Sequence, residues 1–137
     1  MGSIFGSFGI SASGMAAERL RLDVIAENLA NADSTKGADG TPYKRKEVLL
    51  EQAPGASFGD VLNGVQVAAI ASDATPGKRV YDPGHPDADP QGYVTLPNVN
   101  PVTEMVDLIS ASRSYEANVQ AMNTSKSMFT RALDLLR

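Results

Sequence analysis

Residues 22–50 read LDVIAENLANADSTKGADGTPYKRKEVLL, and the chain changes character twice within them. The first part has apolar residues at helical spacing, the middle is rich in Asn, Asp, Gly and Ser, and the end resembles a strand. Asn28 and Asn31 lie beside the apolar residues of the predicted helix, where apolar side chains are usual. Two interpretations stay open: the amides bond within a helix seam and fix its register, or they face solvent at the helix end.

Glycine and proline divide the chain into three parts. Residues 1–32 contain no proline, residues 102–137 contain neither glycine nor proline, and seven of the eight prolines lie between 33 and 100. This distribution predicts an N-terminal axial helix (1–32), a turn-rich β insert with loops (33–100) and a C-terminal axial helix (101–137). The expected fold class is α+β, mainly α, with the two long helices pairing as an antiparallel coiled coil and a small antiparallel β insert between them.

Apolar residues recur every seven positions in both predicted helices, which is the spacing of a coiled coil. The first helix is expected from about Ser11 to Ala32 with Ser11 or Ser13 as its cap, and the last helix opens with Asn100 as cap and Pro101 in its first turn. The predicted seam residues are Phe8, Met15, Leu22, Ile25, Leu29, Met105, Leu108, Tyr115, Val119, Met122, Phe129 and Leu133, with Leu136 continuing one row.

Core packing alone explains any single row, but rows of this length need more apolar cover than one partner helix and a small insert supply. We therefore expect part of the seam to lie between subunits. We also expect the terminal helices of the isolated chain to be largely unfolded until neighbours cover them.

The middle of the chain carries strand and turn signals. The stretch ADGTPYKRKEVLLEQ predicts a turn followed by a strand, GVQVAAIASD predicts a second strand, and KRVYDPGHPDADPQGYVTLP predicts two short strands around a loop. The basic run Lys44 to Lys46 is expected along a strand edge, where it would discourage unwanted pairing. The stiff, proline-rich loop is expected to contact neighbouring subunits through Tyr81, Pro83, His85, Pro86, Asp89 and Tyr93.

Composition and motifs argue against several classes of function. A net charge of −4 gives no basis for nucleic-acid binding, and the lack of cysteine removes disulfides, zinc thiolates and thiol nucleophiles. His85, the only histidine, lies near Asp87 and Asp89, but this set lacks the further ligands of a metal site, and a turn shaped by Asx residues and proline is the better interpretation. No glycine-rich phosphate-binding loop follows a strand. We therefore expect no catalytic residues, no cofactor and no small-molecule substrate.

Two elements of the sequence resemble the flagellar rod and hook family of axial proteins. The first is LDVIAENLANADSTKG followed by YKRKEV, and the second is YDPGHPDADPQGYV followed by PNVNPVTEMVDLISASRSYEANVQAMNTSKSMFTRALDL. The resemblance covers nearly the whole chain, and its length is similar to that of the short rod subunits. It implies a structural subunit of the bacterial flagellar basal body that assembles helically with other rod proteins into the proximal rod, which transmits motor torque.

The resemblance also implies partners and a location. The partners would be the chain itself, proximal and distal rod subunits, the junction between the rod and the basal-body rings, and the flagellar type III export apparatus. The first ten residues lack a basic region and an unbroken apolar stretch, so we expect cytoplasmic synthesis and export without a cleaved signal peptide to the periplasmic rod. In such an assembly Asn28 and Asn31 would set the axial stagger, and Arg113 would contact a neighbour's carboxylate. The alternative is a helical adaptor or binding module that docks one partner protein.

Overall fold

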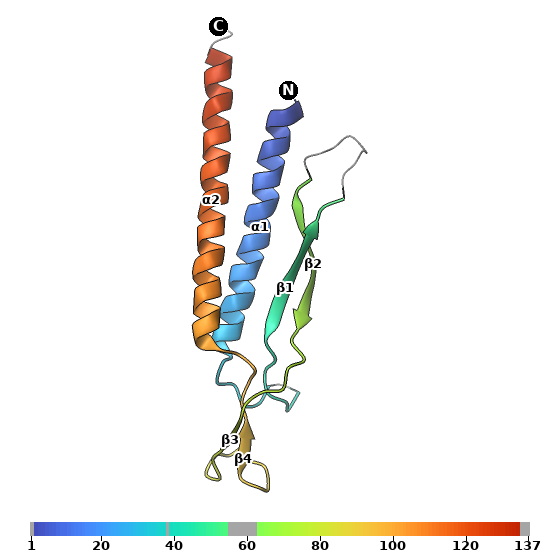
Figure 1. Cartoon of the computed structure of the whole chain (residues 1–137), viewed down its shortest axis with the longest axis vertical. Helices are drawn as coiled ribbons and strands as arrows, with labels where there is room; N and C mark the ends of the chain where they lie inside the picture. The colour runs from blue at the N-terminus through green and yellow to red at the C-terminus, as the bar shows by residue number, and fades with distance from the viewer. Residues whose placement is uncertain (1, 38, 55–62, 135–137) are drawn as a thin grey trace.

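The computed structural model describes residues 2–37, 39–54 and 63–134, with side chains from residue 6 onward (Figure 1). Its elements are helix α1 (Gly2–Ala30), strands β1 (Lys46–Gln52), β2 (Val65–Ser72), β3 (Arg79–Tyr81) and β4 (Tyr93–Thr95), and helix α2 (Pro101–Asp134).

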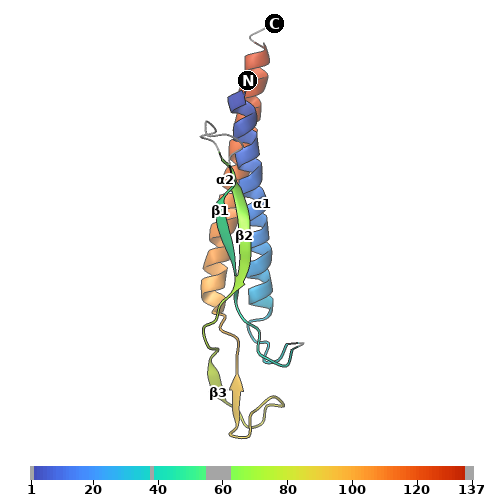
Figure 2. The same ribbon diagram turned by 90° about the vertical axis from the view of Figure 1, so that its right-hand side faces the viewer.

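Two long antiparallel helices form the body of the molecule. Helix α1 lies between α2 on one side and the β1–β2 hairpin on the other, whereas the β3–β4 hairpin projects at the end opposite the two termini (Figures 1 and 2). The expected fold class, mainly helical with a small antiparallel β insert, is confirmed. Because α1 is covered on two sides, only one row of its residues is exposed along the described length.

Helix α1 begins well before the predicted start. It begins at Gly2 rather than Ser11, so its 29 residues extend for ~43 Å. The packing of the helix as a whole offsets the cost of about 1 kcal/mol for each internal glycine. Gly14 also serves the packing, because a β-carbon there would lie 2.9 Å from the Asn118 amide nitrogen on α2. Ser13 is not a cap: its hydroxyl donates to the Ile10 carbonyl (2.8 Å) and accepts the Val65 N–H (3.1 Å), which ties the second hairpin strand to the helix.

Helix α2 begins as predicted. The Asn100 side chain accepts the Val102 N–H (3.1 Å), and Pro101, which lacks an N–H, occupies the first helical position. One of its two predicted rows is half-buried, namely Leu108, Tyr115, Met122 and Phe129, whereas Leu136 lies outside the described residues.

The companion row of α2 differs from the prediction. Glu104 and Ala111 are buried and Asn118 and Ser125 are half-buried, whereas in the predicted row Met105 and Leu133 are exposed within this chain and Val119 is half-buried. The helix is rotated towards its smaller and more polar row because this row permits the close approach of Asn118 to Gly14. Whether Met105 and Leu133 contact other subunits stays a prediction.

Two separate hairpins make up the β insert. Strands β1 and β2 pair antiparallel from Lys46↔Ser72 to Gln52↔Val65, with an irregularity between Leu49 and Leu50. Strands β3 and β4 pair through Tyr81↔Tyr93 and neighbouring residues.

The apolar core is small and lies towards the loop end of the helices. Its buried side chains among the described residues are Ala17, Val24, Ile25 and Ala111, with Val94 in the second hairpin. Neither described helix combines the length and apolar character needed to cross a membrane.

Candidate functional site

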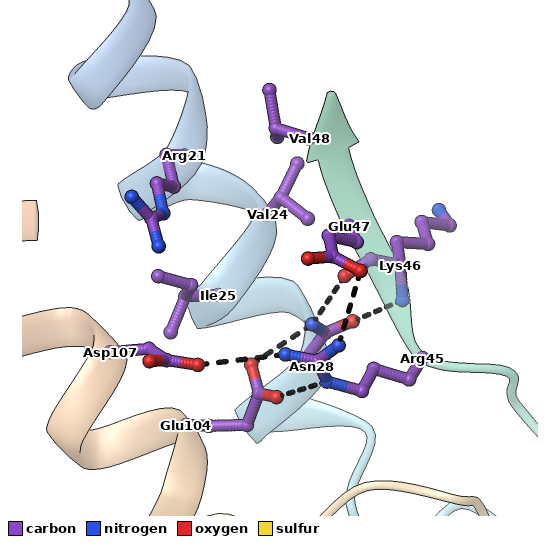
Figure 3. Close-up of a pocket in the computed structure, with 10 residues that line it drawn as sticks. All are labelled: Arg21, Val24, Ile25, Asn28, Arg45, Lys46, Glu47, Val48, Glu104 and Asp107. Carbon is purple, nitrogen blue, oxygen red and sulfur yellow. Dashed lines mark hydrogen bonds and ion pairs between the residues drawn. The ribbon is translucent and has the colours of Figure 1, made fainter. Parts of the chain in front are cut away.

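Asn28 is the centre of a buried polar junction between α1, β1 and α2 (Figure 3). Its side chain is 1% exposed, and it lies in the last turns of α1. The amide nitrogen donates to the Lys46 carbonyl (2.8 Å) and to the Glu104 carboxylate (3.0 Å). The amide oxygen accepts the Lys46 N–H (2.9 Å) and the Tyr43 hydroxyl (2.9 Å). Both donors and both lone pairs of the amide are therefore used, as a buried amide requires.

The bonds between Asn28 and Lys46 imitate the pairing of two strands. The Asn28 amide accepts the backbone N–H of Lys46 and donates to the backbone carbonyl of Lys46, as a residue on a neighbouring antiparallel strand does. Lys46 is the first residue of β1, so the amide fixes where this strand begins against the helix. Leucine would leave both backbone groups unpaired, and aspartate could not donate to the carbonyl.

Glu104 carries the junction into the first turn of α2. Its side chain is 0% exposed, and Arg45 Nε donates to its other oxygen at 2.6 Å. This hydrogen bond raises the pKa of the Arg45 guanidinium above its ordinary value. Arg45 also lies 3.5 Å from Asp107 and 3.7 Å from Glu47, and a carboxylate near a helix N-terminus is favoured by the helix dipole. The buried charge of Glu104 is therefore paired and hydrogen-bonded, which is the condition for tolerating it.

Tyr43 and Lys46 close the junction at the loop side. Burial, followed by the negative charges of Glu27 and Glu104, raises the pKa of Tyr43 to about 12. The hydroxyl therefore stays protonated and donates to Asn28 at all ordinary pH values. The Lys46 ammonium forms an ion pair with Glu27 (2.5 Å) and lies 5.7 Å from the centre of the Tyr43 ring.

The backbone of Arg45 also binds two connecting segments, one just before α2 and one just after β2. Its N–H donates to the Asn98 side chain (2.8 Å), and its carbonyl accepts the Asp73 N–H (2.7 Å). The prediction that the basic run lies along a strand edge and discourages unwanted pairing is therefore wrong for Arg45. Its side chain is largely buried because it forms an ion pair with Glu104, a residue that is distant in the sequence.

Asn31 has a different role from Asn28. It is half-buried, and its amide donates to the Glu27 carbonyl (2.9 Å) while its oxygen accepts the Ser34 hydroxyl (3.1 Å). It thus satisfies a carbonyl in the last turn of α1 and leads the chain out of the helix. The interpretation that both asparagines face solvent is wrong, whereas their contacts to other subunits stay a prediction.

The loop of residues 81–93 is stiffened by its own side chains. The Asp89 carboxylate accepts the N–H groups of Tyr93 (2.8 Å) and Gln91 (3.0 Å) and pairs with Arg79 (2.7 Å). These donors, Tyr93 first, lower the pKa of Asp89. Tyr81 and Tyr93 meet edge to face with ring centres 5.2 Å apart. A rigid loop loses little entropy on docking, so the arrangement is compatible with a contact segment.

The predicted residues of this loop point in different directions. Tyr81, Pro83, Pro86 and Tyr93 are exposed, whereas His85 and Asp89 are half-buried. The His85 ring accepts the Asp87 N–H at 3.1 Å, and the Asp87 carboxylate binds Thr35. Among the described residues no group of three or more His, Asp or Glu side chains gathers in a way that could hold a metal ion.

Sequence reasoning singled out Asn28 but missed its partners. Tyr43, Arg45, Lys46, Asn98 and Glu104 complete the junction. The available signal was an acidic residue in the first turn of α2 together with a basic run just before β1, and the two lie far apart in the chain.

Two family models match the ends of the chain. The model described as flagella basal body rod protein matches residues 8–38, and the model described as flagellar basal body rod FlgEFG protein C-terminal matches residues 91–135. The flagellar basal-body rod protein FlgC of Salmonella typhimurium is 50% identical over 130 residues, which cover 93% of this chain and 94% of the relative. The chain belongs to the FlgC family of flagellar basal-body rod proteins.

Relatives from two further bacteria agree with this membership. The FlgC protein of Bacillus subtilis is 46% identical over 146 residues, covering 96% of this chain and 97% of the relative. The FlgC protein of Borreliella burgdorferi is 46% identical over 151 residues, covering 98% of each chain. The resemblance drawn from the sequence is therefore confirmed, and the chain is a structural subunit of the flagellar basal-body rod.

Proposed function

We propose that the chain assembles helically with copies of itself and with other rod proteins into the proximal rod, which transmits motor torque. The observation that carries this proposal is the exposed apolar start of α2. Val102, Val106 and Ile109 are 70%, 60% and 53% exposed and follow one another along one face of the helix. Apolar residues grouped in this way mark a protein contact. A rod subunit has such contacts on several sides.

The buried junction suits a subunit that carries mechanical load. Asn28, Glu104 and Arg45 join α1, β1 and α2 through hydrogen bonds that have a definite direction, unlike apolar contacts. The angle between the helix pair and the hairpin is thereby fixed. In this proposal, torque turns the subunit as one body.

The proposal extends to partners, route and chemistry on the basis of family membership. The partners are proximal and distal rod subunits and the junction between the rod and the basal-body rings. The chain is made in the cytoplasm, leaves through the flagellar type III export apparatus without a cleaved signal peptide, and resides in the periplasmic rod. It has no catalytic activity, no nucleic-acid partner and no small-molecule substrate. A hydrolytic activity that His85→Ala abolishes would refute the absence of catalysis.

The proposal is tested by deleting the gene and restoring it in the source bacterium. We expect the deletion to leave cells without a rod and without swimming, and the restored chain to appear in purified basal bodies in several copies. Complete basal bodies in the deleted strain would refute the proposal. A complex of one chain with one partner, without repeated copies, would instead identify an adaptor.

A further inference from the structure

Helix α1 exposes one continuous row of residues along the face that neither α2 nor the hairpin covers. The row consists of Gly9, Ala12, Ala16, Arg19, Asp23, Ala26 and Ala30. Its members alternate in steps of three and four, as a helix requires for a single straight face. Ala16, Arg19 and Asp23 of this row also line a shallow groove that reaches Tyr115 on α2. A small-residue surface with two central charges is therefore open to a partner.

Helix α2 exposes a second row with the same stepping. The row consists of Val102, Val106, Ile109, Arg113, Glu116 and Gln120. Within residues 2–37, 39–54 and 63–134, none of the charged residues Arg19, Asp23, Arg113 and Glu116 forms an ion pair. Four unpaired charges on two exposed rows are a pattern that a partner could satisfy.

We propose that the α2 row of one subunit packs against the α1 row of a second copy of this chain, with Arg113 opposite Asp23 and Glu116 opposite Arg19. This inference rests on the proposed self-assembly and names the surfaces that carry it. When the two rows run antiparallel with these charges matched, Ile109 falls opposite Ala26 and Val106 opposite Ala30. Large side chains thus meet small ones on one side of the two ion pairs. Charge complementarity and size complementarity therefore occur in the same alignment of the two rows. This agreement is the reason for proposing a second copy of the chain as the partner.

The alignment also sets the offset between neighbouring subunits. Within one chain Asn28 bonds Glu104 and Gly14 lies against Asn118, so by the same register Arg19 lies level with Arg113. Two copies side by side without an offset would therefore place Arg19 opposite Arg113. Moving one copy by about three to four residues, or ~5 Å along the helix axis, replaces this repulsion with both ion pairs. A shift of the same size in the other direction pairs none of the four charges.

The proposed contact joins two different surfaces, so it does not close into a symmetric pair. An interface of this kind continues from copy to copy and gives a ring or, when each step carries an axial offset, a helix. An offset of ~5 Å for each lateral neighbour therefore predicts helical growth.

The first test exploits the lack of cysteine in the chain. Ala26→Cys and Ile109→Cys variants are expressed together, basal bodies are purified and oxidised, and disulfide-linked peptides are identified by mass spectrometry. Each variant has one thiol, so every disulfide joins two chains. We expect a link between positions 26 and 109. The matched control is Ala12→Cys with Ile109→Cys, on the same row but ~21 Å along the helix, well beyond the ~7 Å limit of a disulfide.

The second test reverses the charges. Arg113→Glu places two negative charges opposite each other, and we expect recovery of the chain in basal bodies to fall at least ~10-fold. Adding Asp23→Arg to the same chain restores the opposite signs and should restore recovery. Arg131→Glu, an equal charge change outside the two pairs, should leave recovery unchanged. Circular dichroism of each purified variant, compared with that of the unmodified chain, verifies that these exposed substitutions leave the helical content of the isolated chain unchanged.

The outcomes separate the two proposals. Absence of the unmodified chain from basal bodies would refute the proposed function and this contact with it. If the unmodified chain is present in basal bodies but the 26–109 link is absent, or the control pair links equally well, the proposed contact is overturned and the proposed function is not. Failure of the second charge change to rescue the first would overturn the matched alignment.

Discussion

Replacing Asn28 by aspartate tests the junction without changing its shape. In Asn28→Asp an oxygen replaces the amide NH2 group, so it faces the Lys46 carbonyl at 2.8 Å and the Glu104 carboxylate at 3.0 Å without a proton to share. Two unit charges at that distance repel by ~5 kcal/mol at an effective dielectric constant of about 20, and each lost buried hydrogen bond costs ~1–3 kcal/mol. Arg45 offsets part of this, because it binds the other Glu104 oxygen. We expect the free energy of unfolding to fall by ~3–5 kcal/mol, a large share of the ~5–15 kcal/mol typical of a protein.

The junction lies beside the buried core at the loop end of the helices, the part of the helix pair that we expect to be folded in the isolated chain. Urea unfolding followed by far-ultraviolet circular dichroism therefore measures this loss at neutral pH and at about pH 5. The neighbouring acceptors raise the pKa of a carboxyl at position 28 in the folded state, so stability is recovered as the pH falls and lost as it rises. The deficit should therefore shrink at the lower pH. Asn123→Asp, the same change at an exposed position of α2, should alter stability by less than ~0.5 kcal/mol. A deficit below ~1 kcal/mol, or one that is equal at both pH values, would refute this account of the junction.

Met122→Asp puts a charge on the half-buried row of α2, and we expect export without incorporation into rods, which analysis of culture medium and basal bodies would reveal. Tyr81→Ala at the exposed loop should change the free energy of unfolding by less than ~1 kcal/mol yet reduce swimming; unchanged swimming would count against a contact there. One of the four tyrosines should titrate near pH 12 by ultraviolet absorbance, and this step should vanish in Tyr43→Phe. The stabilisation from the Tyr43 hydroxyl is complete below pH 10.0 and disappears as the pH rises through about 12. Hydrogen exchange on dilute monomer should show more protection at 104–115 than at 122–134, because the buried side chains of α2 lie near its start. Uniform strong protection along α2 would contradict the expectation that the helices need neighbours.

Local chemistry made parts of the fold predictable. Asn100 followed by Pro101 identifies the start of α2, because the side-chain acceptor and the missing N–H satisfy that helix end within a few residues. The Asp39-Gly40 turn similarly predicted a strand directly after it, and Gly40 does adopt the positive φ of 74° that favours glycine.

The start of α1 and the rotation of α2 could not be predicted from local sequence chemistry. Propensity argues against a helix through Gly6 and Gly9, so this early start depends on tertiary contacts that the local sequence does not reveal. A seven-residue repeat identifies a face of a helix but does not decide between two adjacent rows. The burial of Glu104 and Ala111 rather than Met105 depends on how closely α1 approaches α2.

The junction was predictable only in its central residue. An amide at Asn28 is anomalous against its apolar neighbours, and this anomaly is visible in the sequence. Its partners are set by where β1 and α2 lie in space, so a pattern confined to one helix contains no information about them. Arg45 was misread for the same reason, since its counter-charge comes from Glu104 at another end of the chain.

The hydrogen bond from Asn28 to Glu104 joins residues 76 positions apart. A chain that emerges progressively from a ribosome or a narrow channel therefore cannot complete the junction until most of its length is free. A chain broken before α2 presents an amide without its carboxylate and an arginine without its counter-charge, so it cannot reproduce the geometry of the intact subunit. The junction thus acts as a check on completeness, because only full-length chains acquire the rigid shape that a growing assembly can accept.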